Sequence, residues 1–173
     1  MKKVSKVNFM IESWIFANRM RWLRNKKVKY KECLFCKVVR GEEKAKILFR
    51  DKDLFVMMNK FPYNTGHLMV APTKHIKSLE DLSDEEIKKL FVIVKRCVKI
   101  LKISLKPVGF NIGINMGKYS GASIENHLHI HIVPRFKTDF GFMEVVSKTK
   151  VIPESLNKTF ERLIKHKEIF EKE

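Results

Sequence analysis

The hydrophobic and polar positions of the chain follow the two periods that distinguish β-strands from α-helices. Short apolar stretches at residues 46–50 and 54–58, separated by the charged residues 51–53, predict a β-hairpin. Residues 67–71 form another apolar run after a turn-rich stretch, and residues 109–115 alternate between apolar and small or polar positions. Both segments are expected to form strands, and the second presents small residues on one face, where a ligand can lie close.

Longer segments with apolar residues at helical spacing predict three helices. Ser83 and Glu86 form a capping box at the start of one helix, which must end before Pro107 because the residue preceding a proline disfavours helical geometry. A second amphipathic helix is expected after Pro153, and a third in residues 7–23. The apolar positions are Ile87, Leu90, Phe91, Val94, Val98 and Leu101 in the first, Leu156, Phe160, Leu163, Ile164 and Phe170 in the second, and Val7, Ile11, Trp14 and Ala17 in the third.

Length and charge bear on the domain organisation. The 173 residues, with 45% hydrophobic content, suffice for one buried core. The net charge is +17, and the first 31 residues hold ten Lys or Arg against Glu12 alone, a net charge of +9. We therefore expect a basic, helical N-terminal extension at residues 1–30 and one domain at residues 31–173 that includes the C-terminal helix. The extension either binds nucleic acid or another anionic surface, or it packs on the core or on a second subunit.

Apolar runs and cysteines indicate the compartment. The longest apolar runs span about five residues, too few for a membrane span, and the N-terminus lacks the apolar region of a secretory signal. Three cysteines do not make a disulfide framework, so we expect a cytoplasmic protein. Cys33 and Cys36 have the Cys-x-x-Cys spacing of the first two ligands of a zinc site, although free thiols are the alternative. Cys97 falls on an apolar helix face and is expected in the core.

Histidines alternate with aliphatic residues between His127 and Val133, which predicts a strand with three imidazoles on one face. Leu128, Ile130 and Ile132 would then point into the core. Successive histidines would lie roughly 6.6 Å apart, a spacing that suits either chelation of one metal or contact with a linear anionic substrate. A neutral imidazole, with an ordinary pKa of about 6.5, is also a competent nucleophile. A half-buried strand that carries histidines by chance is the remaining interpretation.

This stretch resembles the histidine triad (HIT) nucleotide-binding proteins, whose motif is His-φ-His-φ-His-φ-φ with φ apolar, and residues 127–133 match every position. The flanking residues 121–126 and 134–136 are similar to those of the branch that contains diadenosine polyphosphate phosphorylases and hydrolases. The likeness covers roughly residues 31–165. It implies an α+β fold, the HIT fold, with an antiparallel sheet, flanking helices and a homodimer that continues the sheet across a two-fold axis.

The resemblance also implies a reaction, the cleavage of a dinucleoside polyphosphate such as diadenosine tetraphosphate at the phosphorus attached to a nucleoside. His129 would attack in line to form a nucleotidyl-histidine, which water or phosphate resolves, and His131 would bind the phosphate or the leaving group. Ser123 matches the phosphate-contacting Ser or Thr of the family. It departs from the common pattern, however, because it lies four residues before His127, one more than in much of the family.

Further substrate contacts are expected from Asn59, His67, Phe49, Phe55, Asn115 and Gly121. Asn59 matches the position that meets the ribose hydroxyls, and the histidine follows the Pro-Gly-His-like corner of the family. The two phenylalanines either form walls for the base or belong to the hydrophobic core. Asn115 is expected to face the site, and Gly121 ends a flexible loop whose backbone N–H groups are expected beside the phosphates.

Zinc-containing HIT proteins resemble this chain in a set of two cysteines and two histidines, which implies structural zinc bound by Cys33, Cys36, His75 and His127. The resemblance implies no catalytic metal. Two other classes of function remain open. A non-enzymatic nucleotide or nucleic-acid binding protein with structural zinc would explain the basic extension, whereas a plain metal-binding module would use the histidines together as ligands.

Overall fold

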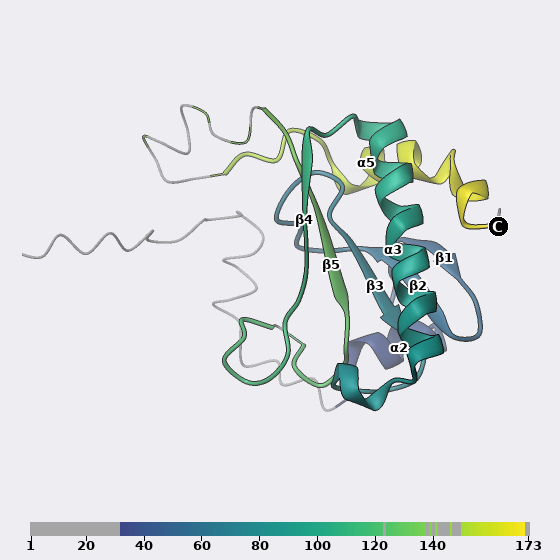
Figure 1. Cartoon of the computed structure of the whole chain (residues 1–173). Coiled ribbons are helices and arrows are strands. Elements are labelled where there is room, and N and C mark those ends of the chain that lie inside the picture. The colour runs from purple at the N-terminus through teal and green to yellow at the C-terminus, as the bar shows by residue number, and fades with distance from the viewer. Residues whose placement is uncertain are drawn as a thin grey trace, which may run out of the picture.

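An antiparallel sheet forms the centre of the computed structural model, which describes residues 32–122, 124–137, 139, 141, 146 and 150–171 (Figure 1). The strands are Ile47–Arg50 (β1), Leu54–Met58 (β2), Leu68–Pro72 (β3), Gly109–Ile114 (β4) and Ile130–Arg135 (β5). Within the described residues they form one five-stranded sheet in the order β1-β2-β3-β5-β4, and the predicted hairpin is β1 and β2. The fold is α+β, as predicted. The extension expected at residues 1–30 lies outside the described residues.

The long helix α3, Asp84–Leu105, covers one face of the sheet and packs on β3 and β5 (Figure 1). Its predicted capping box is confirmed, because the Ser83 hydroxyl accepts from the N–H of Glu86 at 3.3 Å and the Glu86 carboxylate accepts from the N–H of Ser83 at 2.8 Å. The helix ends where Lys106 adopts a left-handed φ of 53° directly before Pro107.

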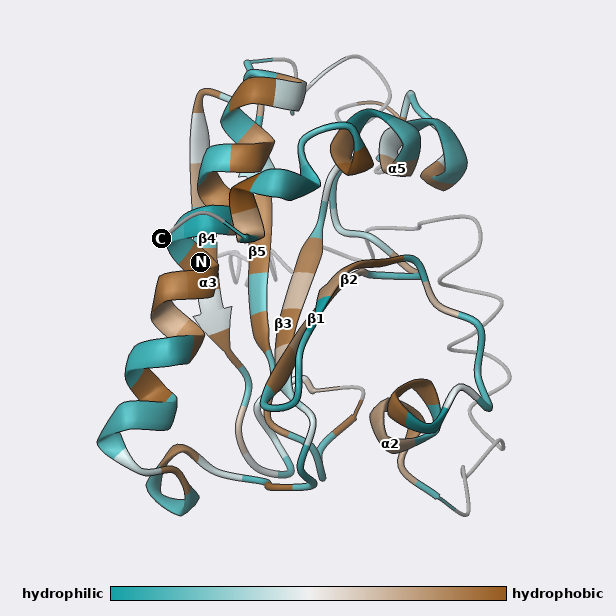
Figure 2. Ribbon diagram, turned by 90° about the vertical axis from the view of Figure 1, so that its right-hand side faces the viewer, coloured by the Kyte–Doolittle hydropathy of each residue, from teal (hydrophilic) through white to brown (hydrophobic). Residues whose placement is uncertain are grey.

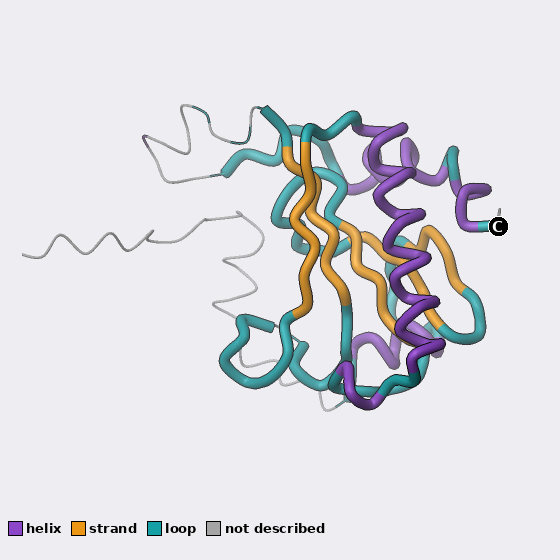
Figure 3. Tube along the Cα trace, in the orientation of Figure 1, coloured by secondary structure: helices purple, strands orange, loops and turns teal. Residues whose placement is uncertain are grey.

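Shorter helices surround the rest of the sheet (Figure 3). The C-terminal helix α5, Leu156–Ile164, packs against α3 and β1, and the 3₁₀ helix η2, Lys167–Phe170, follows it against α3. A second 3₁₀ helix, η1, Leu79–Asp81, precedes α3. The helix α2, Leu34–Arg40, lies on the face of the sheet opposite α3 (Figure 2). In the part of the chain that the structure describes, no helix is both long and apolar enough to cross a membrane.

Alternation of side chains along the strands produces two apolar clusters, one on each face of the sheet. The larger cluster joins the sheet to α3, α5 and η2, and from β2 and β3 it contains Leu54, Val56, Met58, Leu68 and Val70. The smaller cluster contains Phe55, Met57, Met69 and Ala71 from the sheet and Phe35 and Val38 from α2. The α2 face therefore has a thin apolar cover, and this is the face on which the histidines lie.

The histidine strand begins later than the sequence predicts. β5 starts at Ile130, and the preceding residues from His127 onward are not in the ladder. The N–H of Leu128 donates instead to the carbonyl of Ile76, at 2.7 Å, in the segment that follows β3. The alternation nevertheless persists, because Leu128, Ile130 and Ile132 are all buried in the larger cluster, as predicted.

The turn between β2 and β3 positions His67 directly before the first residue of β3. Gly66 precedes this histidine with a φ of 80°, which only glycine adopts without strain, and a Cβ at this position would collide with Leu105 of α3. Asn64 anchors the turn from the other side, since its Nδ2 donates to the carbonyl of Pro134 at 2.9 Å. The corner before His67 is thus fixed by both α3 and β5.

Asp139 is the buried charge that joins this turn to the end of β5. Its carboxylate accepts from Asn64 Nδ2 at 2.7 Å and from Arg135 Nε at 2.5 Å, and it lies 3.5 Å from Lys150 Nζ. Burial opposes its ionisation, but the hydrogen bonds from Asn64 and Arg135 outweigh burial and hold the pKa of Asp139 below its ordinary value. The charge therefore stabilises the fold above the ordinary pKa of 3.8, and this stabilisation is lost as the pH falls further.

Substitution Asp139→Asn is expected to lower the free energy of unfolding by about 2–3 kcal/mol at pH 7, because charge-assisted hydrogen bonds are lost. Asp81→Asn, on an exposed side chain of η1, is the control and should change stability by less than about 0.5 kcal/mol. Urea unfolding measures both, and the difference should shrink below pH 3.8, where the wild-type carboxylate also loses its charge. Equal stability of the two variants at pH 7 would contradict this role of Asp139.

Candidate active site

A cavity of about 400 Å³ lies on the α2 side of the sheet. Met57 and Met69 of the sheet line it together with α2, the segment of residues 43–46 and the first residue of α5. His129 and His131 line it as well, so that a mostly apolar cavity meets two imidazoles. Such a combination suits a ligand with one apolar, planar part and one part that takes hydrogen bonds or reacts.

His129 is held as a neutral imidazole with a defined tautomer. The residue is 3% exposed, and its Nδ1 lies 2.8 Å from the carbonyl oxygen of His127. Because a carbonyl only accepts, Nδ1 carries the proton and Nε2 carries the lone pair. Burial lowers the pKa of His129, and the hydrogen bond to His127 opposes this only partly. A neutral imidazole with a lone pair on Nε2 is a nucleophile that needs no prior deprotonation.

The hydrogen bond from His67 determines which ring nitrogen of His131 carries the proton. The N–H of Tyr63 donates to His67 Nδ1 at 3.0 Å, so His67 carries its proton on Nε2. That atom lies 3.0 Å from His131 Nδ1, which therefore accepts and leaves the His131 proton on Nε2. The rings of His129 and His131 are 4.7 Å apart at 74°, which puts a nucleophile and a hydrogen-bond donor side by side.

Space beside His131 comes from its neighbour in the sheet. His131 pairs with Met69 of β3 on one side and with Gly113 of β4 on the other. Nothing lies within 4 Å of the position that a Cβ of Gly113 would take. A ligand can therefore approach the histidine from the β4 side.

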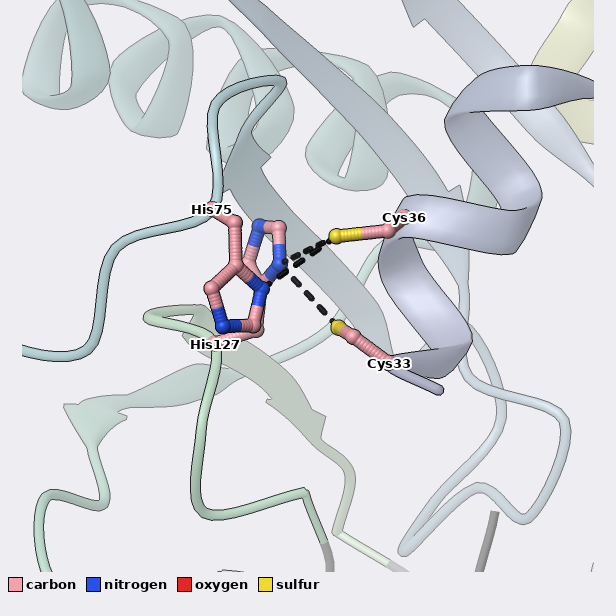
Figure 4. Close-up of side chains that lie close together, drawn as sticks. All are labelled: Cys33, Cys36, His75 and His127. Atoms are coloured by element: carbon pink, nitrogen blue, oxygen red, sulfur yellow. Dashed lines mark hydrogen bonds between the residues drawn. The ribbon is translucent and has the colours of Figure 1, made fainter. Parts of the chain in front are cut away.

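A cluster of two cysteines and two histidines lies next to His129 (Figure 4). Cys33 and Cys36 come from the start of α2, His75 from the loop after β3, and His127 from the segment before β5. Their ligand atoms all lie within 4.8 Å of one another. His127 Nδ1 is 3.3 Å from Cys33 Sγ and 3.7 Å from Cys36 Sγ, and His75 Nδ1 is 3.2 Å from Cys36 Sγ.

This geometry fits a tetrahedral zinc ion. Bonds of about 2.3 Å to sulfur and about 2.0–2.1 Å to nitrogen require the four ligand atoms to lie about 3.4–3.8 Å apart, close to the observed separations. His127 Nε2 lies 2.9 Å from the carbonyl of Pro72 and therefore carries the proton, which leaves Nδ1 as the metal ligand. The cluster predicted from the sequence is brought together by the fold and is compatible with structural zinc.

Binding of a metal would change the protonation of the cysteine thiols in this cluster. Burial, with a smaller contribution from His75 and His129, lowers the pKa of His127 to about 4, so its imidazole is neutral at pH 7 and able to bind a cation. Burial and the neighbouring Cys33 raise the pKa of Cys36 to about 11. A metal must therefore displace a thiol proton from Cys36, which makes its affinity fall as the pH falls.

Among the expected nucleoside contacts, Asn59 lines the cavity and the two phenylalanines do not. The Asn59 carbonyl oxygen accepts from the N–H of Phe61 at 2.9 Å, and its Nδ2 lies 3.4 Å from His67 Nδ1. Phe49 instead stacks on Phe170 at 5.1 Å, and Phe55 meets Phe35 edge-on at 6.0 Å behind the cavity wall. In the structure both phenylalanines make packing contacts, which is the alternative weighed for both.

The expected phosphate contacts are only partly described. Ser123 lies outside the described residues. Asn115 follows β4 directly and is half-buried, but it does not line the cavity. Gly121 adopts a φ of 86° in an exposed loop, which satisfies the backbone freedom expected of this position, and it does not line the cavity either.

Sequence reasoning missed the residues that form the cavity walls. Leu34, Phe35 and Val38 of α2 line the cavity, as do Tyr63 and Leu156. Phe35 stands inside the Cys-x-x-Cys segment, so its closeness to the cluster was available from the sequence. Its contact with the histidines depends on how α2 crosses the sheet, which no local pattern encodes.

Comparison with known proteins agrees with the fold and the site. The HIT domain family matches residues 40–138, and the chain belongs to this family. It is 38% identical over 119 residues to a Mycobacterium tuberculosis protein named AP-4-A phosphorylase, a match that covers 69% of this chain and only 61% of that protein. It is 35% identical over 127 residues to an uncharacterised HIT-like protein of Methanocaldococcus jannaschii, covering 70% of this chain and 97% of the relative.

A solved structure shares the architecture. The crystal structure of a Zn-bound histidine triad family protein from Mycobacterium smegmatis superposes with a TM-score of 0.67 at 25% identity and covers 81% of this chain and 96% of that chain. The similarity supports the assignment of the HIT fold to the described sheet and helices. The chain thus has both the sequence match and the fold of the HIT domain family.

The protonation state of His129 can be measured without any substrate. Because burial lowers its pKa, the imidazole should become charged only below pH 6.5, and Nδ1 should carry the proton throughout the neutral range. Nuclear magnetic resonance of the ring nitrogens during a pH titration reports both quantities, with His129→Gln as the control that identifies the signal. A titration midpoint at or above pH 6.5, or a proton on Nε2, would contradict the described environment.

Proposed function

We propose that this protein cleaves dinucleoside polyphosphates of the diadenosine tetraphosphate type through a nucleotidyl-histidine on His129. The observation that carries the proposal is the neutral, oriented imidazole of His129 at the wall of a nucleotide-sized cavity. The similarity to AP-4-A phosphorylase supports the substrate class, although that match spans only part of the relative. A phosphoanhydride suits this site, because the phosphate that leaves can be stabilised by a single hydrogen-bond donor such as His131.

The reaction follows from the two tautomers. His129 Nε2 attacks the phosphorus attached to the nucleoside, an N–P bond forms, and the bond from this phosphorus to the bridging oxygen breaks. His131 Nε2–H donates a hydrogen bond to the departing oxygen or to the phosphoryl oxygens. Water or inorganic phosphate then attacks the nucleotidyl-histidine and restores His129. The proton stays on His129 Nδ1 throughout, and its hydrogen bond to the carbonyl of His127 stabilises the positive charge that the ring acquires on attack.

Binding would divide the substrate between two environments. The apolar cavity takes the base, and Asn59 lies at the edge of the cavity where its side chain meets the ribose hydroxyls. Three lysines line the cavity, Lys44, Lys46 and Lys60. Among the described residues, Lys60 is the one of the three with an acidic partner, Glu43 at 3.5 Å. This positive charge favours a polyanion. Ser123, Asn115 and Gly121 would complete the phosphate contacts from the loop before the histidines.

Zinc would have a structural role in this scheme. The four ligands of the cluster, Cys33, Cys36, His75 and His127, complete a tetrahedral set, so no coordination position remains for a substrate. Bound zinc would cross-link α2, the loop after β3 and the segment before β5. We propose no catalytic metal.

The assembly proposed is a homodimer that continues the sheet. Among the described residues β4 pairs only with β5, which leaves its other edge available for a strand of a second copy. Val108 and Ile112 are 62% and 44% exposed on or next to this strand. Light scattering should give twice the chain mass of 20.5 kDa. The mass of a single chain at micromolar concentration would contradict the dimer.

Substitution of the nucleophile tests the enzymatic proposal. His129→Ala should lower turnover of diadenosine tetraphosphate by about four orders of magnitude or more, because the covalent step is lost, while nucleotide binding remains. His166→Ala, in the turn after α5 and remote from the cavity, is the matched control. Chromatography of the products with and without phosphate distinguishes hydrolysis from phosphorolysis. Binding without turnover in the wild type would favour the alternative, a non-enzymatic nucleotide or nucleic-acid binding protein.

The zinc proposal has its own test. Elemental analysis should find one zinc per chain, and His75→Ala should weaken zinc binding by at least about 10–100-fold, the loss seen even for outer-shell partners. His166→Ala should keep the zinc of the wild type. A protein without stoichiometric zinc, or one in which His75→Ala retains wild-type affinity, would overturn the assignment of the cluster.

A further inference from the structure

The helix α2 belongs to the zinc cluster and to the cavity at the same time. Cys33 is its N-cap residue and Cys36 lies in its first turn, where both sulfurs face His75 and His127 (Figure 4). Between and after the cysteines, Leu34, Phe35 and Val38 of the same helix line the cavity. Any movement of α2 relative to the sheet therefore changes the shape of the cavity.

Phe35 connects the two sites directly. Its side chain is fully buried, and its ring meets the ring of His127 at 5.2 Å and the ring of His129 at 5.0 Å, both edge-on. His127 is a cluster residue and His129 lines the cavity. Phe35 thus supports the ring of His129 from a position between the two cysteines.

The first turn of α2 is held by the two cysteines of the zinc cluster and by the buried side chain of Phe35. The helix has only seven residues, and its N-cap side chain makes no capping hydrogen bond. A helix of this length is not stable alone, so it depends on tertiary contacts. Among the described residues, those contacts include the smaller apolar cluster, to which α2 contributes the buried Phe35 and Val38, and a hydrogen bond from the Arg50 side chain to the carbonyl of Val39. At the start of the helix they are the cysteine contacts with the two histidines of the zinc cluster.

We propose that the Cys33–Cys36 pair is a redox switch for nucleotide binding: zinc fixes α2 as a wall of the cavity, and oxidation of the two cysteines by a peroxide releases zinc and loosens this wall. The inference rests on the proposed nucleotide site and on the proposed zinc. In the oxidation, an S–S bond forms between the two sulfurs and the O–O bond of hydrogen peroxide breaks. The peroxide takes two electrons from the two thiolates and two protons from the buffer, and it leaves as two water molecules.

The two cysteines are placed for this chemistry. Their Sγ atoms lie within 4.8 Å of each other, and both residues are only half-buried, so a small oxidant reaches them. A disulfide needs Cβ atoms about 3.5–4.5 Å apart, whereas residues three positions apart on a helix have Cβ atoms about 5–6 Å apart, so the first turn of α2 must change shape when the S–S bond forms. Zinc holds its cysteine ligands as thiolates, the form that a peroxide oxidises.

Cys97 provides an internal comparison. It is fully buried among the apolar residues of α3, and burial raises the pKa of its thiol far above the ordinary value. A buried, protonated thiol reacts poorly with peroxide. Of the three cysteines, only the pair in the cluster is therefore expected to respond.

The coupling between the sites must be reciprocal. If zinc favours the arrangement of α2 that binds a nucleotide, then a bound nucleotide favours retention of zinc by the same factor. Adenosine monophosphate in the cavity would pack against Phe35 and its neighbours in α2, and it should therefore slow the release of zinc by peroxide. This effect does not depend on turnover.

The experiment uses the reduced, zinc-loaded full chain, with adenosine monophosphate as the probe and calorimetry as the readout of affinity. Hydrogen peroxide should release one zinc per chain, measured with a chromogenic chelator, and should convert Cys33 and Cys36 into one disulfide by mass spectrometry. Affinity for the probe should fall at least tenfold, and dithiothreitol with zinc should restore it. This reversal excludes oxidation of Met57 and Met69 in the cavity, since dithiothreitol does not reduce methionine sulfoxide.

The variant Cys97→Ala should respond to peroxide like the wild type. Unchanged affinity after zinc release, retained zinc after disulfide formation, or no protection of zinc by the probe would each overturn the switch. Global unfolding on oxidation, followed by circular dichroism, would also overturn it, because the proposed change is confined to α2. Failure of the reduced protein to bind the probe would instead count against the proposed function.

Discussion

The hydrogen bond from His129 Nδ1 to the carbonyl oxygen of His127 is the interaction on which the site depends. It decides the tautomer, and together with burial it keeps a neutral lone pair on the cavity side. The bond forms because Leu128, between the two histidines, is buried in the larger apolar cluster, while both imidazoles lie on the other face. The packing of Leu128 in the core thus turns the ring of the next residue, His129, toward the cavity.

The same segment serves two kinds of chemistry. His127 turns its Nδ1 toward the two cysteines of α2 and fixes its Nε2 on Pro72, whereas its backbone carbonyl serves His129. His131 lies in β5, and its tautomer is set by the hydrogen bond from His67. The turn that contains Asn64 and Gly66 positions His67 for this contact. Three alternating histidines therefore have three different sets of hydrogen-bond partners: cysteine sulfurs and a backbone carbonyl for His127, a backbone carbonyl for His129, and the His67 side chain for His131.

Local patterns in the sequence predicted much of the fold. The β1–β2 hairpin, the capping box of α3 and its end before Pro107 all rest on signals within a few residues, and the structure confirms them. The predicted C-terminal helix forms as α5 but ends at Ile164, and Phe170 lies in the separate helix η2. The spacing of Cys33 and Cys36 pointed to the first two ligands of a zinc site, and the family resemblance added His75 and His127; the four residues do come together. The late start of β5 and the packing of Phe49 on Phe170 depend on partners distant in the chain, such as Ile76 and η2, which periodicity cannot encode.

The central claim is that His129 forms the covalent bond to the nucleotide. A reaction with diadenosine tetraphosphate, quenched within milliseconds at alkaline pH because phosphoramidates are acid-labile, should contain protein with the added mass of one adenosine monophosphate. Fragmentation of the peptide that spans residues 119–135 should assign this mass to His129. Turnover with the adduct on His131, or turnover without any adduct under conditions where the first step is fast, would contradict the account.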